Sequence, residues 1–427
     1  MTAAPASSFR AFSSRRYRLY FSGQGISLIG TWIQQLAASW LVFRMTRSPF
    51  WLGVVAFASQ APSIVLTPLA GVLADRWSRH RMMITIQTLD MALALIMAGL
   101  IWTGWVTIGW VVAISSIFGI VGAFDAPTRH AFVVQLVEKR EHLPNAITLN
   151  SIMFNAARLI GPSVAGLLIA WIGEGGCFFI NGLSFLAVIA ALLAMGKMPG
   201  PVDENPREGI WQGLRDGVQV TFRHPILRPL ILFAAWLGFC CYPYTVLMPV
   251  LANVVLGGGP RTLGLLLGSL GGGALIGGFL QTRRQSVRTL AEFNSGGAFL
   301  LGGSLFLLAF SRNLPTAMAI LLACGLGTIS QLTSGNTQVQ LTAPEEYRAR
   351  IMSFLMLAFF GTVPLGSLVF GTLAGQVGTP AVLAGAGAAA MAGAIVFARA
   401  MSRHEGRPFH FPSPWDLITQ ATRSPRS

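Results

Sequence analysis

Charged side chains make up only 11% of this chain, so those beside its long apolar runs are the first candidates for chemistry. Asp75, Arg76 and Arg79 fall between two such runs, Phe50 to Ala74 and Met82 to Trp102. Each run is long enough to cross a bilayer, which places these charges in a very short loop between two membrane helices. The arginines favour a cytoplasmic position for this loop, because basic loops stay on that side.

Two carboxylates at the predicted cytoplasmic ends of apolar spans have candidate partners of opposite charge. Gly71, one turn before Asp75, lets two helices approach closely, and Asp75 could meet the positive N-terminal end of a later membrane helix near residues 348–352. Asp125 ends the fourth apolar span in the stretch that leads to Arg129. It could pair with the loop arginines while the cytoplasmic side is closed, or form a static ion pair that fixes topology.

Two further charges fall inside apolar spans. Arg158 lies about 16 Å beyond the start of its span near Ile147, and Asp90 about 12 Å beyond Met82, at about 1.5 Å per helical residue. A lone arginine at that depth is costly on the lipid face, so we expect Arg158 to face the protein interior. It could contact an anionic or polar substrate, partner a proton-carrying carboxylate, or form a structural ion pair. Asp90 is a candidate proton carrier, with a structural role equally open.

Composition excludes a soluble enzyme. The 427 residues are 53% hydrophobic with a mean hydropathy of +0.62, whereas soluble domains carry roughly a quarter charged residues. The net charge of +15 would suggest nucleic acid in a soluble domain. Here most basic residues fall in loops on one side of the apolar spans, so we expect a lipid bilayer as the partner and no nucleic acid.

Several kinds of site are absent from the sequence. The four cysteines lie in or beside apolar runs without metal-ligand spacing, and we expect free thiols. The six histidines fall in loops or tails, and neither a HExxH nor a P-loop motif occurs. We therefore predict no metal, no cofactor and no ATPase, so that energy comes from an ion gradient or from the substrate's own gradient.

The apolar spans define the organisation of the chain. We place them at approximately 17–43, 49–74, 82–102, 105–125, 147–172, 175–196, 226–255, 261–282, 289–310, 314–336, 348–373 and 379–401. The predicted divisions are an N-terminal tail (1–16), a six-helix bundle (17–196), a linker (197–225), a second six-helix bundle (226–401) and a C-terminal tail (402–427). The fold class is thus an all-α integral membrane protein with 12 transmembrane helices in two pseudo-symmetric bundles.

Topology follows from the basic residues. Of the 30 Lys and Arg residues, the opposite side of this arrangement receives only Arg44, Arg47, Arg261 and Arg312. The positive-inside rule therefore places both termini and the linker in the cytoplasm of a multi-pass protein, in a bacterial inner membrane. The two halves also look like copies, since Gly71 to Arg76 and Gly278 to Arg283 occupy matching places.

The loop pattern G-x-x-x-D-R-x-x-R-x-R resembles the signature of the major facilitator superfamily between its second and third helices. The stretches Gly30 to Gln35, Asp125 to Arg129 and Arg158 to Pro162 look like the branch that contains the bacterial enterobactin exporter and macrolide-efflux proteins. The resemblance covers roughly residues 10–401. It departs at Ser78, where glycine is usual.

The resemblance implies further site residues. In this fold the first, fourth, seventh and tenth helices line the cavity, which makes four amides candidate substrate contacts: Gln34, Gln35, Gln331 and Asn336. Interhelical hydrogen bonding is the equal alternative. Gly161, Pro162 and Gly166 resemble the fifth-helix motif of exporters, although a packing kink would give the same pattern.

The predicted function is export of a small amphiphilic molecule, such as a siderophore, drug or metabolite, by proton antiport with alternating access. We expect a monomer. The alternatives are a nutrient importer of the same fold and a membrane sensor or assembly protein without flux. The polar first span and the buried Arg158 favour flux, because a sensor needs neither.

Overall fold

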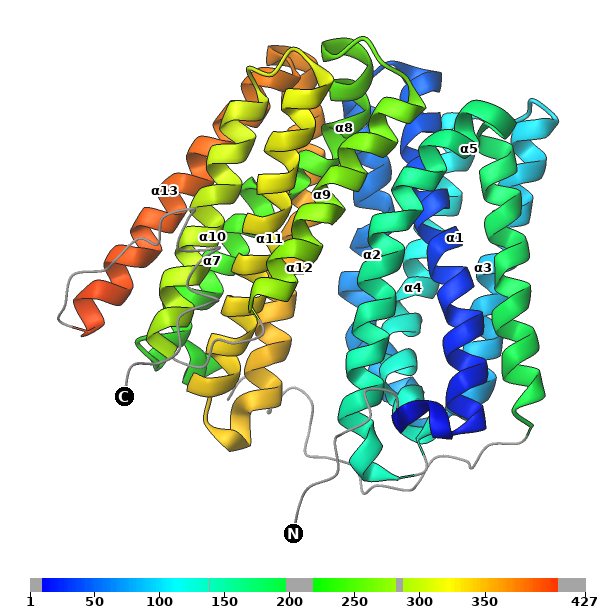
Figure 1. Cartoon of the computed structure of the whole chain (residues 1–427), viewed down its shortest axis with the longest axis horizontal. Helices are drawn as coiled ribbons and strands as arrows, with labels where there is room; N and C mark the ends of the chain where they lie inside the picture. The colour runs from blue at the N-terminus through cyan, green and yellow to red at the C-terminus, as the bar shows by residue number, and fades with distance from the viewer. Residues whose placement is uncertain (1–9, 138, 197–217, 282–286, 406–427) are drawn as a thin grey trace. The chain divides into compact units, whose positions relative to one another are not determined.

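The computed structural model describes residues 10–137, 139–196, 218–281 and 287–405, and its regular elements there are helices (Figure 1). The chain forms two compact units. The first comprises residues 1–46 and 58–203, and the second comprises 47–57 and 204–427. The division passes through one helix, α2, whose first turns belong to the second unit. The predicted limits of the bundles, linker and tails stay predictions.

The first unit is built from long apolar helices, because a helix satisfies its backbone hydrogen bonds within itself and so tolerates lipid. Its elements are η1 (Arg10–Ser13), α1 (Arg15–Thr46), most of α2 (Pro49–Arg76), α3 (Arg79–Trp102), α4 (Ile108–Leu136), η2 (Arg140–His142) and α5 (Leu143–Ala194). Helix α1 packs along α5, and α3 packs against both α4 and α5.

The helix α5 is two membrane spans joined at Gly173. This glycine has φ 70° and ψ 179°, a left-handed conformation that side chains other than glycine rarely adopt. Beside the break, Arg44 of α1 donates two hydrogen bonds to the buried Glu174, at 2.7 Å from Nε to Oε1 and 3.2 Å from Nη2 to Oε2. The predicted separation of the fifth and sixth spans is therefore present, with an ion pair fixing it to α1.

Two predicted spans differ from the structure. The fourth does not end at Asp125, because α4 continues through Pro127 to Leu136. The seventh is not one helix. It breaks after α7 (Leu227–Cys240) into short helical pieces, because Pro243 and Pro249 each remove a backbone donor.

The second unit continues from these pieces through five longer helices. Its elements after α7 are η3 (Tyr242–Leu247), α8 (Met248–Val250), η4 (Leu251–Val255), α9 (Pro260–Gln281), α10 (Val287–Leu308), α11 (Leu314–Thr342), η5 (Glu345–Tyr347), α12 (Arg348–Val377) and α13 (Thr379–Glu405). Helix α11 packs between α9 and α10, α10 also contacts α13, and α12 packs on α7.

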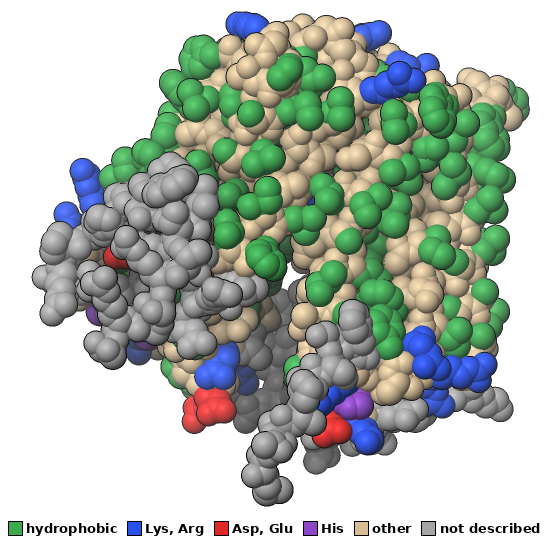
Figure 2. Space-filling view, in the orientation of Figure 1, with side chains coloured by type: hydrophobic (Ala, Val, Ile, Leu, Met, Phe, Trp, Pro, Cys, Tyr) green, Lys and Arg blue, Asp and Glu red, His purple; other side chains and the backbone are tan. Residues whose placement is uncertain are grey.

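Ten described helices are long and apolar enough to cross a membrane. Counting α5 as two spans and adding the apolar α10 gives the twelve that the sequence predicts. Figure 2 shows hydrophobic side chains along the helices of each unit, with Lys and Arg gathered toward the helix ends. The fold is an all-α membrane protein.

Candidate functional site

The turn between α2 and α3 is as short as predicted. Helix α2 ends at Arg76 and α3 begins at Arg79, so only Trp77 and Ser78 separate them. Gly71, Asp75 and Arg76 lie on the last turns of α2, and their side chains fall outside the described set. Arg79 donates from Nη1 to the carbonyl oxygen of Ala131, 3.5 Å away on α4. This contact ties the turn to the fourth helix.

An ion pair lies on α4 beside this turn. Arg129 donates from Nη2 to Oδ2 of Asp125, one helical turn away, and the two side chains are only 19% and 16% exposed. The sequence instead suggested Arg76 or Arg79 as the partner of Asp125. The reason for the difference is that α4 does not stop at Asp125, so Arg129 lies on the same helix face. Pairing with the loop arginines in another state stays a prediction.

Arg129 acts on more than one acid. Its charge interacts with Asp90 of α3 and with Tyr20 of α1 as well as with Asp125, and Asp90 and Asp125 also interact. Tyr20 is fully buried and packs its ring edge-on against Phe132 of α4, 6.0 Å between centroids. Sequence reasoning missed Tyr20, because in an apolar span it reads as a packing residue. Arg129 thus forms an ion pair with Asp125 on α4, and Asp90 of α3 and Tyr20 of α1 lie within reach of its charge.

The amides predicted on the first span have different surroundings. Gln34 accepts a hydrogen bond at 2.7 Å from Nδ2 of Asn181, on the second half of α5. Ser184 donates to Oδ1 of Asn181 at 3.0 Å, which completes a buried polar link between α1 and α5. Gln35 is exposed. Gln34 therefore has the interhelical role that the sequence left open, and Gln35 remains available to a ligand.

Arg158 lies half-buried on α5 with its guanidinium carbon 5.9 Å from the ring centroid of Trp32 on α1. The close approach of these helices depends on Gly161, where a Cβ atom would collide with the Cβ of Trp32. Pro162 and Gly166 are buried on the same helix, which continues through the proline. The described partner of Arg158 is thus an aromatic face. Trp32 and Arg158 both lie in stretches that carry the family resemblance, but their contact could not be read from the sequence.

In the second unit, Gln331 is buried on α11 and accepts a hydrogen bond at 3.1 Å from the hydroxyl of Tyr242. Tyr242 also packs edge-on against Phe359 of α12, with 4.4 Å between ring centroids. Asn336 is half-buried farther along α11. The break in the seventh span therefore turns an aromatic side chain toward one of the predicted amides.

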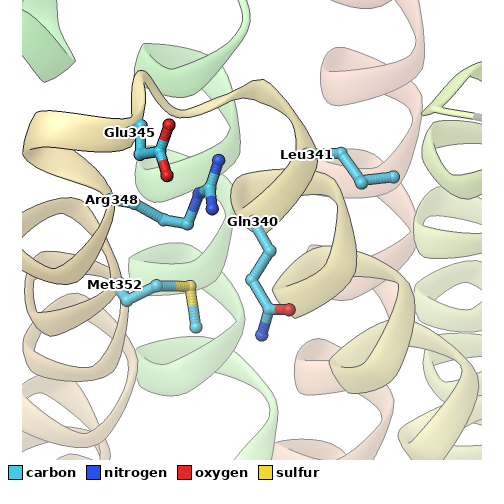
Figure 3. Close-up of a pocket in the computed structure, with 5 residues that line it drawn as sticks. All are labelled: Gln340, Leu341, Glu345, Arg348 and Met352. Carbon is cyan, nitrogen blue, oxygen red and sulfur yellow. The ribbon is translucent and has the colours of Figure 1, made fainter.

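A cavity of about 620 Å³ opens where α11 passes into α12. It is lined by Gln340 and Leu341 from the end of α11 and by Glu345, Arg348 and Met352 from η5 and the first turns of α12. Figure 3 shows the carboxylate of Glu345 and the guanidinium of Arg348 next to one another at this cavity. The first turn of α12 has no side-chain cap at Tyr347, so its N-terminal end is accessible to a polar group.

Within the described ranges, no group of three or more His, Cys, Asp or Glu side chains could hold a metal ion. The four cysteines are free thiols, three of them buried.

The apolar helices of the described part of the chain, with charged and amide side chains in their contacts, indicate a multi-pass membrane protein. Residues 6–413 match the family described as "Transmembrane secretion effector". The chain belongs to this family of the major facilitator superfamily and is a transporter rather than an enzyme.

Two relatives are similar in sequence to most of this chain. The staphyloferrin A transporter of Staphylococcus aureus (strain NCTC 8325 / PS 47) is 23% identical over 363 residues, which cover 84% of this chain and 90% of that protein. The multidrug efflux pump Tap of Mycolicibacterium fortuitum is 25% identical over 372 residues, covering 84% and 87%.

Solved structures agree in fold. A bacterial homologue of the human lysosomal transporter Spinster aligns with a TM-score of 0.69 at 15% identity, covering 98% of this chain and all of that one. A bacterial homologue of the iron transporter ferroportin aligns with a TM-score of 0.71 at 17% identity, covering 91% and 99%.

Proposed function

We propose that this transporter exports a small amphiphilic molecule, such as a siderophore, drug or other metabolite, by proton antiport with alternating access. The named activities of the relatives, a staphyloferrin A transporter and a multidrug efflux pump, support the substrate class. The relatives leave the coupling ion open, so the proposal for protons rests on the side chains of this chain.

The observation that carries the proposal is the Asp125–Arg129 ion pair on α4, with a second carboxyl group, Asp90 of α3, close enough to interact with both charges. Among these three groups, one guanidinium balances one carboxylate, and the second carboxylate adds an excess negative charge. Binding one proton makes this group of three neutral, and releasing it restores the excess charge. Because an excess charge is unfavourable in a low-dielectric interior, the protonated and deprotonated groups favour different arrangements of the helices around them.

The substrate path uses the polar side chains that remain accessible. We assign Gln35 and Arg158 in the first unit and Asn336 in the second as contacts for the polar part of the substrate. Trp32, which faces the Arg158 guanidinium, adds an aromatic surface for an apolar part. Gln34 and Gln331 hold neighbouring helices through their hydrogen bonds and orient the path.

The turn between α2 and α3 acts as the switch in this proposal. Gly71 and Asp75 lie in the last turns of α2. After the turn, Arg79 contacts α4, the helix that carries Asp125 and Arg129. Asp75 would dock on the accessible N-terminal end of α12 in one of the alternating states. Gly161, Pro162 and Gly166 set the close contact of α5 with α1 on which the substrate contacts depend.

The test uses the purified full-length protein in liposomes with a proton gradient and a panel of siderophores and drugs, preselected by susceptibility of a knockout strain. An exporter that exchanges protons releases protons from the acidic lumen when its substrate is added outside. Asp90→Asn should abolish this release, whereas Glu346→Gln, an exposed acid at the α11–α12 turn, should not. Substrate movement without proton movement would exclude antiport, and accumulation in intact cells would favour the importer.

A further inference from the structure

A groove between α3 and α4 contains none of the residues assigned above to proton coupling or to the substrate path. It encloses about 560 Å³ within the first unit and is lined by the start of α3 and by the middle of α4. This volume is in the range of sites for small molecules. The groove has a polar end and an apolar length, and these two features together indicate its ligand.

The polar end lies at the α2–α3 turn. Trp77, Ser78 and Arg81 line it, and Trp77 is 60% exposed. Ser78 holds the N-cap position of α3 without a side-chain hydrogen bond to the helix. Arg81 is exposed and has no ion-pair or hydrogen-bond partner among the described residues. The groove therefore presents a hydroxyl and an exposed positive charge beside a tryptophan, as membrane–water interfaces favour.

Apart from Thr85, the rest of the groove is lined by apolar side chains. Its wall on α3 runs through Ile86 to Leu89, and its wall on α4 includes Ile120 and Phe124. Leu89 and Ile120 are 47% and 41% exposed, although they lie within membrane-crossing helices. Arg81 and Leu89 are about 12 Å apart at about 1.5 Å rise per residue. One leaflet contributes about 15 Å to the hydrocarbon core, so the groove extends through most of one leaflet.

We propose that this groove binds one anionic phospholipid of the cytoplasmic leaflet, with its phosphate beside Arg81 and Ser78 and an acyl chain along Leu89 and Ile120. The cation selects an anionic headgroup, because no carboxylate among the described residues forms an ion pair with Arg81. The apolar walls select a chain of hydrocarbon. An aqueous phosphate compound would satisfy only the first requirement, and a neutral hydrophobic molecule only the second.

The test measures lipids that stay bound to the full-length protein by native mass spectrometry. The protein is exchanged into detergent with phosphatidylglycerol and phosphatidylethanolamine of identical acyl chains. A single arginine near a membrane phosphate favours the anionic lipid on the order of fivefold. Arg81→Gln should remove this preference. The matched control is Arg312→Gln, an exposed arginine between α10 and α11 that lines neither described cavity.

A second variant tests the apolar length. Ile120→Trp leaves Arg81 in place but fills the groove, so retention of both lipids should fall, while monodisperse elution and the melting temperature report folding. Added glycerol phosphate should not displace the bound lipid. The proposal is overturned if the wild type shows no preference for phosphatidylglycerol, if Arg81→Gln and Arg312→Gln lose equal amounts, or if Ile120→Trp retains both lipids fully.

Discussion

Arg129 pairs with Asp125 one turn away on α4, and its charge also acts on Asp90 of α3. The arrangement exists because α4 continues past Asp125 to Leu136, which puts an acid and a base four residues apart on the same face. A guanidinium shared between carboxyl groups of two helices couples the charge on either acid to the packing of α3 against α4.

The first prediction concerns this shared charge. Asp125→Asn and Asp90→Asn should each lower proton-coupled transport by at least about tenfold at normal protein level, which corresponds to about 1.4 kcal/mol. The double variant should be no worse than the poorer single variant, because groups that act as a unit are not additive. Proton release from liposomes measures the effect. Additive losses would show that the two acids act separately.

The features predicted correctly from the sequence are those that follow from the length of apolar segments needed to cross a membrane. The short turn between Arg76 and Arg79 and the division of α5 at Gly173 follow from apolar length and from a glycine between two runs. The predicted end of the fourth span was wrong because α4 continues beyond its apolar segment, past Asp125. Hydropathy indicates contact with lipid and not the length of a helix. Such reasoning also missed Tyr20 and Trp32, because an aromatic side chain in a span gives no sign of its partner.

The second prediction is the orientation of the chain. Both termini and the 197–225 linker should lie in the cytoplasm, on the basis of the positive-inside rule. In a variant without native cysteines, Gly209→Cys should react with a membrane-impermeant maleimide only after the cells are opened. Arg312→Cys, from the side that has few basic residues, should react in intact cells. Labelling of Gly209→Cys in intact cells would reverse the topology.

The third prediction concerns the switch. Asp75→Asn should keep expression and folding but impair transport, because the neutral amide interacts more weakly with the positive end of a helix and so destabilises one of two alternating states. Asp75→Glu keeps the negative charge at the same position and is the matched control. Initial transport rates of both variants show whether transport depends on the charge of Asp75. A wild-type rate for Asp75→Asn would leave the turn with a topological role alone.

The last prediction concerns Arg158, whose guanidinium lies over the ring of Trp32. Arg158→Lys keeps the charge but loses the planar group that stacks on an indole, so transport should fall at normal protein level. Arg158→Ala should lower transport further. Because the described partner is a neutral ring, this variant leaves no buried acid uncompensated, and the loss of about 0.5–1 kcal/mol should hardly change protein level.

Two companion variants separate the role of Arg158 from general effects of charge. Trp32→Phe keeps an aromatic face and should retain more transport than Trp32→Leu, whereas Lys139→Ala removes an exposed positive charge and should leave transport unchanged. Transport of the preselected substrate, normalised to protein level, is the measurement. Full transport by well-expressed Arg158→Ala would rule out a role in the substrate path. Equal transport by Trp32→Phe and Trp32→Leu would show that the aromatic face is dispensable.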